Sequence, residues 1–178
     1  RLRMDHVAIE TDGGMSEAVG EIDTSRWPEQ TYDVTSRLQF ARMRELFFAN
    51  EPWRLSGEGH FAGVFHLFKG GHDLMGQFTS PVAGVYDYRF PSLYGGLHWD
   101  KSGFQVTDAG AELFGGDATF GFAIGPLGVP EKPKATFDVD YTNVDLAAVS
   151  DFYDLAGIRF AGRASGRNVL VWPMGRFR

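Results

Sequence analysis

Apolar and polar residues alternate with a period of two through most of the chain. In residues 135–141 the apolar side chains fall on one face, and Thr136, Asp138 and Asp140 fall on the other. The same scheme recurs in residues 7–10, 86–90, 97–99, 104–106 and 117–124. Successive side chains of a β-strand point to opposite sides, so this pattern predicts strands with one apolar and one polar face. We expect roughly ten strands, mostly antiparallel.

Turn-forming residues separate these segments. Asp100-Lys101-Ser102-Gly103 predicts a hairpin turn between two alternating segments. Residues 125–133 predict a longer loop, because their Gly and Pro residues interrupt a hydrogen-bonded ladder. Phe, Tyr and Trp make up 15% of the chain, with 16 Phe. Aromatic residues favour strands, which strengthens the all-β prediction.

Two short segments have helical spacing instead. Residues 41–49 place Met43, Leu46 and Phe47 on one stripe. Residues 144–155 do the same with an apolar stripe of their own, consisting of Leu146, Val149, Phe152 and Tyr153. Flanking residues predict the ends of this second helix, namely Asn143 as N-cap, Asp145 in the first turn and Gly157 after the end. Both helices are too short to cover a large sheet.

Residues 34–70 and 139–175 share a weak internal similarity. The identical pairs are Val34 and Val139, Phe47 and Phe152, Arg54 and Arg159, Gly57 and Gly162, and Gly70 and Gly175. Self-similarity of this kind is typical of units that stack in an array. We therefore expect residues 1–178 to form a single segment with a weak repeat. The chain begins with Arg1 rather than Met, so we expect it to be an internal piece of a larger protein.

Composition excludes several classes of function. The net charge is −6 and no basic stripe is present, which argues against nucleic acid as a partner. Because there is no Cys, disulfides and thiolate chemistry are excluded. No run approaches the roughly 20 apolar residues of a membrane-spanning helix.

A search for catalytic residues finds no convincing constellation. His66 and His72 flank a Gly-Gly turn and could approach each other, but a third ligand is not evident. Asp138 and Asp140 share one face of a strand, where they form either an acid–base pair or a solvated surface, and we favour the surface. We therefore expect no enzyme, no metal and no cofactor.

An apolar, largely aromatic set of residues is the best candidate site. Two interpretations remain open: these residues form the core of a closed β-sandwich or barrel, or they line a curved sheet whose apolar face is an open groove. Acyl chains of phospholipids would suit such a groove. The predicted lining residues are Phe65, Leu67, Tyr86, Tyr88, Phe90, Leu97, Trp99, Phe120, Phe122, Ile124, Phe137, Val139 and Tyr141.

Several segments together resemble a known family. They are residues 61–74, Tyr94-Gly95-Gly96-Leu97, Leu113-Phe114-Gly115-Gly116, Val144-Asp145-Leu146 and residues 162–166. The chain resembles, most clearly from Trp27 onward, the TamB (translocation and assembly module) branch of the AsmA-like proteins. The resemblance implies a U-shaped, repeating β-groove in a long periplasmic protein of a Gram-negative-type bacterium, anchored in the inner membrane. It also implies that phospholipid is carried between the two membranes, and it links the branch to the assembly of outer-membrane β-barrels with an outer-membrane partner.

Three functions therefore compete. The first is a lipid-conducting groove whose strand edges pair with neighbouring repeats of the same polypeptide. The second is a scaffold or chaperone module that offers strand edges to outer-membrane proteins. The third is a closed β-sandwich that acts as a binding module. Unpaired strand edges also predict that the isolated segment associates or precipitates.

Overall fold

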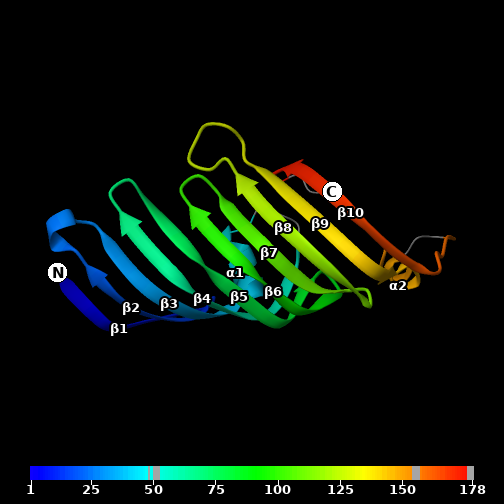
Figure 1. Ribbon diagram of the computed structural model, residues 1–178, viewed down its shortest axis with the longest axis horizontal. Helices are drawn as coiled ribbons and strands as arrows, with labels where there is room; N and C mark the ends of the chain where they lie inside the picture. The colour runs from blue at the N-terminus through cyan, green and yellow to red at the C-terminus, as the bar shows by residue number, and fades with distance from the viewer. Residues whose placement is uncertain (48, 50–52, 154–156, 176–178) are drawn as a thin grey trace.

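The chain folds into ten strands and two short α-helices in a computed structural model, which describes residues 1–47, 49, 53–153 and 157–175. Figure 1 shows the strands side by side in chain order. The strands are β1 (Leu2–Thr11), β2 (Gly14–Ile22), β3 (Gln30–Gln39), β4 (Leu55–Phe68), β5 (Gly71–Val85), β6 (Tyr88–Asp100), β7 (Phe104–Leu113), β8 (Gly116–Gly125), β9 (Lys134–Asp145) and β10 (Arg163–Pro173). The helices are η1 (Thr24–Arg26, 3₁₀), α1 (Phe40–Phe47) and α2 (Leu146–Phe152).

All ten strands belong to one antiparallel sheet. Each strand pairs with its neighbours in the sequence, and β1 and β10 are the two edges. The predicted all-β fold with two short helices is confirmed. The sheet is open, so the alternative of a closed sandwich or barrel is wrong.

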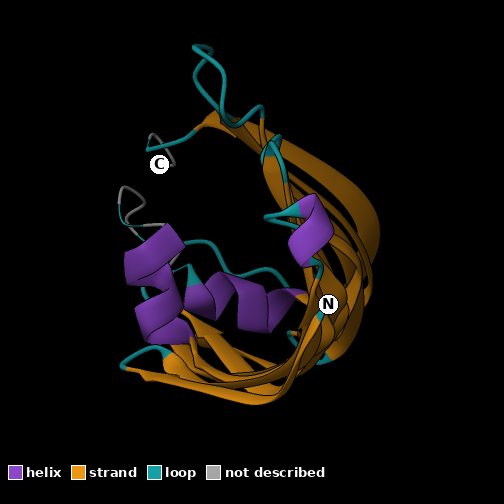
Figure 2. Ribbon diagram, turned by 90° about the vertical axis from the view of Figure 1, so that its left-hand side faces the viewer, coloured by secondary structure: helices purple, strands orange, loops and turns teal. Residues whose placement is uncertain are grey.

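The sheet bends without curling strongly, and both α-helices lie inside the bend (Figure 2). The U-shape implied by the family resemblance is present only as this bend. We call the face inside the bend the inner face; it carries Phe61, Phe122 and Trp172. Phe40, the first residue of α1, lies against Gly59 of β4 on this face, so the helix packs directly onto the sheet.

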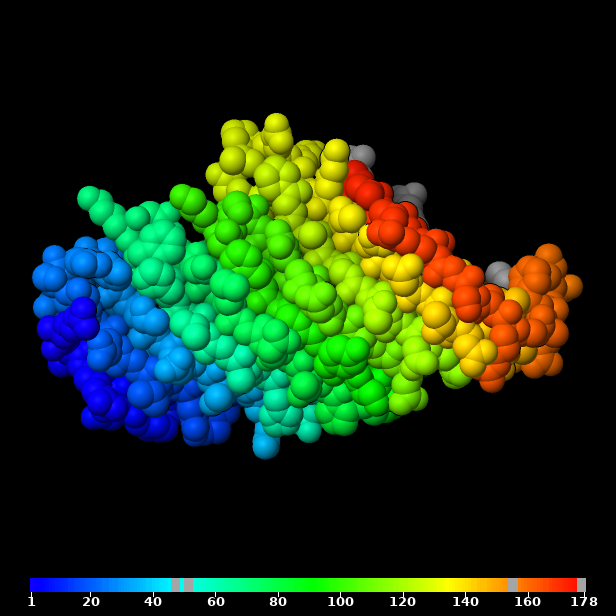
Figure 3. All heavy atoms as spheres, viewed as in Figure 1, coloured from blue at the N-terminus to red at the C-terminus, as the bar shows by residue number. Residues whose placement is uncertain are grey.

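No described helix or strand covers the opposite, outer face. It faces the viewer in Figure 3, where the colours follow the order of the strands from one end of the sheet to the other. The accessible surface of the chain is 11372 Å². A compact monomer of this mass exposes about 8,600 Å². Much more surface is therefore exposed than a two-layer domain would leave.

The core is correspondingly thin. Its buried apolar residues are mostly small, and they lie along the sheet rather than in one cluster: Phe61, Ala83, Ala109, Ala111, Ala118, Ile124, Ala135, Val139 and Val144. Small side chains at these positions leave space for the larger side chains beside them.

The predicted helices exist but their ends differ. α1 begins one residue before the predicted start, and the side chains of Leu46 and Phe47 lie outside the described residues. α2 ends at Phe152, and residues 154–155 of the predicted helix also lie outside them. Asn143 is not the N-cap, because it belongs to β9 with a φ of 57°. The N-cap is Asp145, whose Oδ1 accepts a 2.8 Å hydrogen bond from the Ala147 N–H.

The two similar segments have the same order of elements. Residues 34–70 contain most of β3, then α1 and β4, and residues 139–175 contain part of β9, then α2 and β10. Gly57 and Gly162, which correspond in the two segments, both have positive φ, at 95° and 102°. The prediction that they are repeats of one unit stays a prediction.

Two facing glycines make room for the largest buried side chain. A Cβ on Gly76 would lie 2.6 Å from the Phe61 ring and 2.3 Å from the Ala62 carbonyl oxygen. A Cβ on Gly63 would lie 2.7 Å from the same ring. None of these three contacts is tolerable, so the strands here must carry glycine for Phe61 to pack.

We predict that Gly76→Ala lowers the free energy of unfolding by about 1–3 kcal/mol, because the added methyl group overpacks the site of Phe61. Gly121→Ala is the matched control, since its Cβ would meet only the Val106 carbonyl oxygen at 3.6 Å. Urea unfolding of both variants measures the difference. Equal stability of the two would contradict the packing role given to Phe61.

Candidate functional site

The inner face is the candidate site, and strand register decides which side chains share it. Phe65 of β4 lies opposite Leu74 of β5, which in turn lies opposite Trp99 of β6. Further along the sheet, Phe122 of β8 lies opposite Phe137 of β9. The register places these predicted residues on the inner face together: Phe65, Leu67, Leu97, Trp99, Phe120, Phe122, Ile124, Phe137, Val139 and Tyr141.

Ring contacts run along this face. Phe104 lies 6.4 Å from Phe122, and Phe122 lies 6.3 Å from Trp172. Phe120 and Phe137 are 5.4 Å apart. Most of these rings are half-buried, whereas Ile124 and Val139 are buried between them.

Trp53 covers part of the inner face. It lies in the connection between α1 and β4, yet its ring meets Phe122 at 6.2 Å and Trp172 at 6.0 Å. A residue from the β3–β4 connection therefore reaches side chains of β8 and β10. Together with α1, Trp53 leaves the inner face partly covered, with no second sheet over it.

A second aromatic cluster lies at α2. Tyr88 contacts Phe90 at 4.6 Å, Phe114 at 4.1 Å and Phe152 of α2 at 5.5 Å. The Phe114 N–H also donates a hydrogen bond to the Tyr88 hydroxyl oxygen. The predicted residue Tyr88 thus packs against a helix of the same chain, and the predicted residue Phe90 packs against Tyr88. They stabilise that end of the sheet.

Tyr86 does not belong to a strand, contrary to the alternation read from residues 86–90. It lies in the turn between β5 and β6 with a φ of 53°, and it is exposed. The Arg54 guanidinium carbon lies 6.0 Å from the centre of its ring, a cation–π contact at the surface.

The inner face becomes more polar toward the N-terminal strands. The Ser16 and Ser36 hydroxyls, on β2 and β3, are hydrogen-bonded at 2.7 Å. The Tyr32 hydroxyl donates to Gln30 Oε1 at 2.8 Å on β3. The apolar part of the face therefore begins near β4 and extends to β10.

The two histidines beside the Gly-Gly turn lie on opposite faces. His72 is on the inner face, where its ring centre is 4.4 Å from that of Trp99. His66 is on the outer face, with Nε2 3.8 Å from Glu29 Oε1. They cannot share a ligand. Among the described residues, no three His, Asp or Glu side chains converge as a metal site would require.

Asp138 and Asp140 lie on the outer face and are held by an arginine. Arg167 of β10 donates from Nε to Asp138 Oδ1 at 2.8 Å, and its Nη2 also pairs with Asp138. Asp140 Oδ2 lies 3.9 Å from the same Nε. The hydrogen bond from Arg167, with its charge, lowers the pKa of Asp138. The two aspartates therefore take part in a cross-strand contact with Arg167 on the outer face.

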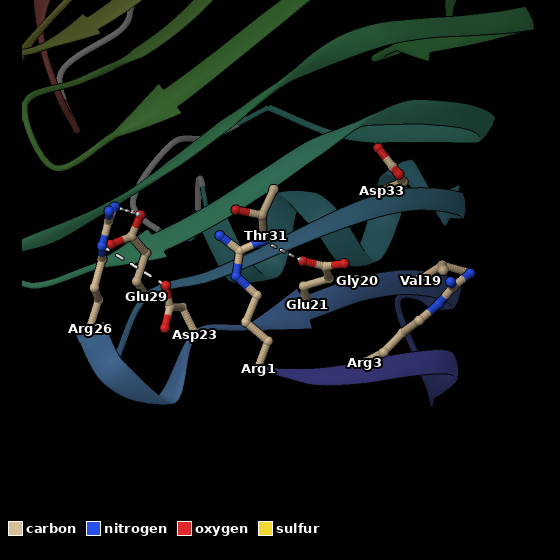
Figure 4. Close-up of a pocket in the computed structure, with 10 residues that line it drawn as sticks. All are labelled: Arg1, Arg3, Val19, Gly20, Glu21, Asp23, Arg26, Glu29, Thr31 and Asp33. Carbon is tan, nitrogen blue, oxygen red and sulfur yellow. Dashed lines mark ion pairs between the residues drawn. The ribbon is translucent and has the colours of Figure 1, made fainter.

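A polar hollow of about 530 Å³ lies over the outward-facing residues of β2 and β3 (Figure 4). Ion pairs join five of its charged groups: Arg1 pairs with Glu21 at 3.6 Å, and Arg26 pairs with Glu29 at 3.8 Å and with Asp23 at 3.9 Å. The hollow is therefore a surface network of ion pairs, separate from the apolar inner face.

Comparisons of the chain with protein-family models, with curated proteins and with solved structures found no match. Within the described part of the chain, neither α-helix has the length or hydropathy to cross a membrane.

Several inner-face residues were missing from the predicted set. Leu74, Phe104, Leu170 and Trp172 follow from the alternation of their own strands, so the sequence carried a signal for them. Trp53 lies in an irregular connection, where no period places its side chain. Only the folded chain brings it onto the inner face.

We predict that Arg167→Gln raises the pKa of Asp138 toward its ordinary value of 3.8, because the hydrogen bond and the nearby positive charge are lost. A folded-state pKa below that of the unfolded chain stabilises the fold at neutral pH, and this contribution disappears as the pH falls through the lowered pKa. NMR titration of the Asp138 carboxyl carbon measures the shift. Asp100 is the control, since hydrogen bonds from Ser102 lower its pKa and do not involve Arg167. An unchanged Asp138 titration in the variant would contradict this assignment.

Proposed function

We propose that the inner face binds the acyl chains of lipids, as a segment of a groove that conducts phospholipid through an aqueous compartment. The observation that carries the proposal is a continuous row of apolar side chains from β4 to β10 on the inside of a single-layer sheet. No charged side chain lies among the paired inner-face positions that run from Phe65 of β4 to Trp172 of β10. Such a face suits a ligand without polar groups of its own.

The half-buried state of the inner rings supports this function. A face packed under a second layer would have no room for a ligand, whereas these rings retain exposed area and Leu170 is 47% exposed. Each CH₂ group that moves from water onto such a face gains about 0.8 kcal/mol. Movement along the row keeps that gain nearly constant, so transport needs no chemical step.

Partial cover by α1 and Trp53 limits where a chain can lie. Phe122 and Trp172 already contact Trp53, and Tyr88 already contacts Phe152. The open part of the face therefore includes Leu170. The resemblance to the TamB branch of the AsmA-like proteins supports the wider assignment to lipid transport across a periplasm.

We predict that a photo-crosslinking amino acid at Leu170 captures phospholipid several-fold more efficiently than one at Val169. The two positions are adjacent on β10 and similarly exposed, at 47% and 56%, but they lie on opposite faces of the sheet. Mass spectrometry of the crosslinked protein purified from cells identifies the adduct. Equal yields at the two positions, or no lipid adduct at Leu170, would falsify binding on the inner face.

The edge of β10 favours a second candidate function, the docking of another β-strand. Val169 and Val171 are 56% and 60% exposed, and residues 168–172 carry no charge. An uncharged, apolar edge strand is a ready template for β-augmentation. β1 is better protected, because Arg3, Asp5 and a bulge between Met4 and Val7 interrupt its edge.

We predict that Val171→Lys reduces self-association of the protein, since a charge on the exposed edge opposes strand pairing. Sedimentation velocity of the wild type and the variant at equal concentration measures the effect. Val19→Lys is the control. Val19 is 42% exposed, but it lies on β2, which is paired on both sides and is therefore not an edge strand. Association that is unchanged by Val171→Lys, or equally reduced by Val19→Lys, argues against docking at β10.

A further inference from the structure

All four lysines of the chain lie at one rim of the sheet. Lys69 is in the turn between β4 and β5, and Lys101 is in the turn between β6 and β7. Lys132 is in the connection from β8 to β9, and Lys134 is the first residue of β9. Every one of them is exposed. Figure 1 shows these three connections along the upper margin of the sheet, and we call this margin the lysine rim.

The lysines differ from the arginines in their partners. Most described arginines form ion pairs, such as Arg54 with Asp87 at 3.5 Å and Arg159 with Asp151 at 3.1 Å. No lysine forms an ion pair with a described residue. In a chain of net charge −6, four unneutralised cations on one margin form a local positive strip.

The three connections of the lysine rim contact one another. Lys101 Nζ donates to the Gly70 carbonyl oxygen at 3.3 Å, which joins the first turn to the second. The Leu127 N–H donates to the Ser102 carbonyl oxygen at 2.8 Å, which joins the second turn to the β8–β9 loop. Neighbouring turns on this rim are two strands apart, or about 10 Å. The lysines therefore form a continuous strip.

The acids at this rim do not cancel the strip. Asp100 Oδ1 accepts hydrogen bonds from the Ser102 and Gly103 N–H groups at 2.7 and 2.9 Å, so its carboxylate is used to close the turn. Glu131 is the other acid of the three connections. Asp73 lies opposite Asp100 in the β5–β6 register, and its Oδ1 is 2.9 Å from His98 Nε2. Four lysines thus face three acids, and two of these acids already contact other groups of the chain.

The apolar inner face extends to the lysine rim. His72 and Trp99, whose ring centres are 4.4 Å apart, lie at the ends of β5 and β6 next to the turns that carry Lys69 and Lys101. An acyl chain on this part of the face would place its polar end beside the lysines. The charge at that end then decides how well it is held.

We infer that the lysine rim binds the phosphate of an anionic lipid headgroup whose acyl chain lies on the inner face. This inference rests on the proposed function, and it adds a preference for lipids with net negative charge. An ammonium group is a compact charge that binds phosphate without a fixed geometry, which suits a headgroup moving from one lysine to the next. The exposed lysines attract the headgroup through their positive charge. Because salt screens this attraction, a higher salt concentration weakens the preference for anionic lipid.

The experiment compares two lysolipids with the same lauroyl chain, as monomers in solution. Lysophosphatidylglycerol is anionic, and lysophosphatidylcholine has no net charge. By isothermal titration calorimetry at low salt, we expect the wild-type chain to bind the anionic lipid about tenfold more tightly. The variant with Lys69, Lys101, Lys132 and Lys134 all changed to Gln should bind both with equal affinity, at the wild-type affinity for the choline lipid.

A matched variant controls for net charge. Arg42, Arg54, Arg89 and Arg159, which lie in or beside connections at the opposite rim, are all changed to Gln. This arginine variant loses as many positive charges as the lysine variant, and we expect it to keep the preference for the anionic lipid. Circular dichroism establishes that both variants retain the wild-type fold, and single Lys→Gln variants replace the quadruple one if it does not fold.

The outcomes separate the two proposals. If neither lysolipid binds the wild type, acyl-chain binding on the inner face is wrong and the lysine rim has no lipid to hold. If both bind equally, or if the Lys→Gln variant keeps the preference, only the role of the lysines is wrong. Glycerol 3-phosphate is the third ligand in the titration. If it binds as tightly as lysophosphatidylglycerol, the rim binds free phosphate and the inference is overturned.

Discussion

Hydrogen bonding between neighbouring strands holds this fold together, because the described strands form a single bent sheet with no second sheet packed on it. Nine antiparallel pairs in chain order supply the ladder hydrogen bonds, and each strand depends on the two beside it. The side chains of one face then pack mainly along the sheet rather than across a core. This explains why the buried apolar residues are mostly alanines and why facing glycines make room for Phe61. A sheet built in this way leaves an apolar face with room on it.

Most of the architecture is encoded in the period-two alternation. Residues such as Leu97, Trp99, Phe137 and Val139 lie on the predicted face because their strands are regular there. The predictions fail where the backbone leaves the extended region. Tyr86 continues the alternation in the sequence, but its φ of 53° places it in a turn. A pattern of residue types contains no information about such dihedral angles.

Tertiary contacts explain the remaining differences. Trp53 has no periodic neighbours, so nothing local indicates that it crosses to Phe122 and Trp172. The sequence predicts that Tyr88 and Phe90 line a groove. The alternation of side chains along their strand does not reveal that α2 brings Phe152 against Tyr88. The apolar composition of the face was predictable, whereas the segments that cover it were not. The open area of the inner face is consequently smaller than alternation alone implied.

The charged side chains of the strands lie away from the apolar inner face. Arg167 is held by Asp138 on the outer face, and Arg159 is paired with Asp151 beside α2. The four lysines, which form no ion pair with a described residue, lie at one rim of the sheet next to the inner face. An ammonium group there remains hydrated and costs little, whereas the same group among Phe122 and Trp172 would need a partner. If the inner face binds lipid as proposed, a face of this composition would discriminate between lipids only at its margin, beside the lysines, and would accept any acyl chain along its length.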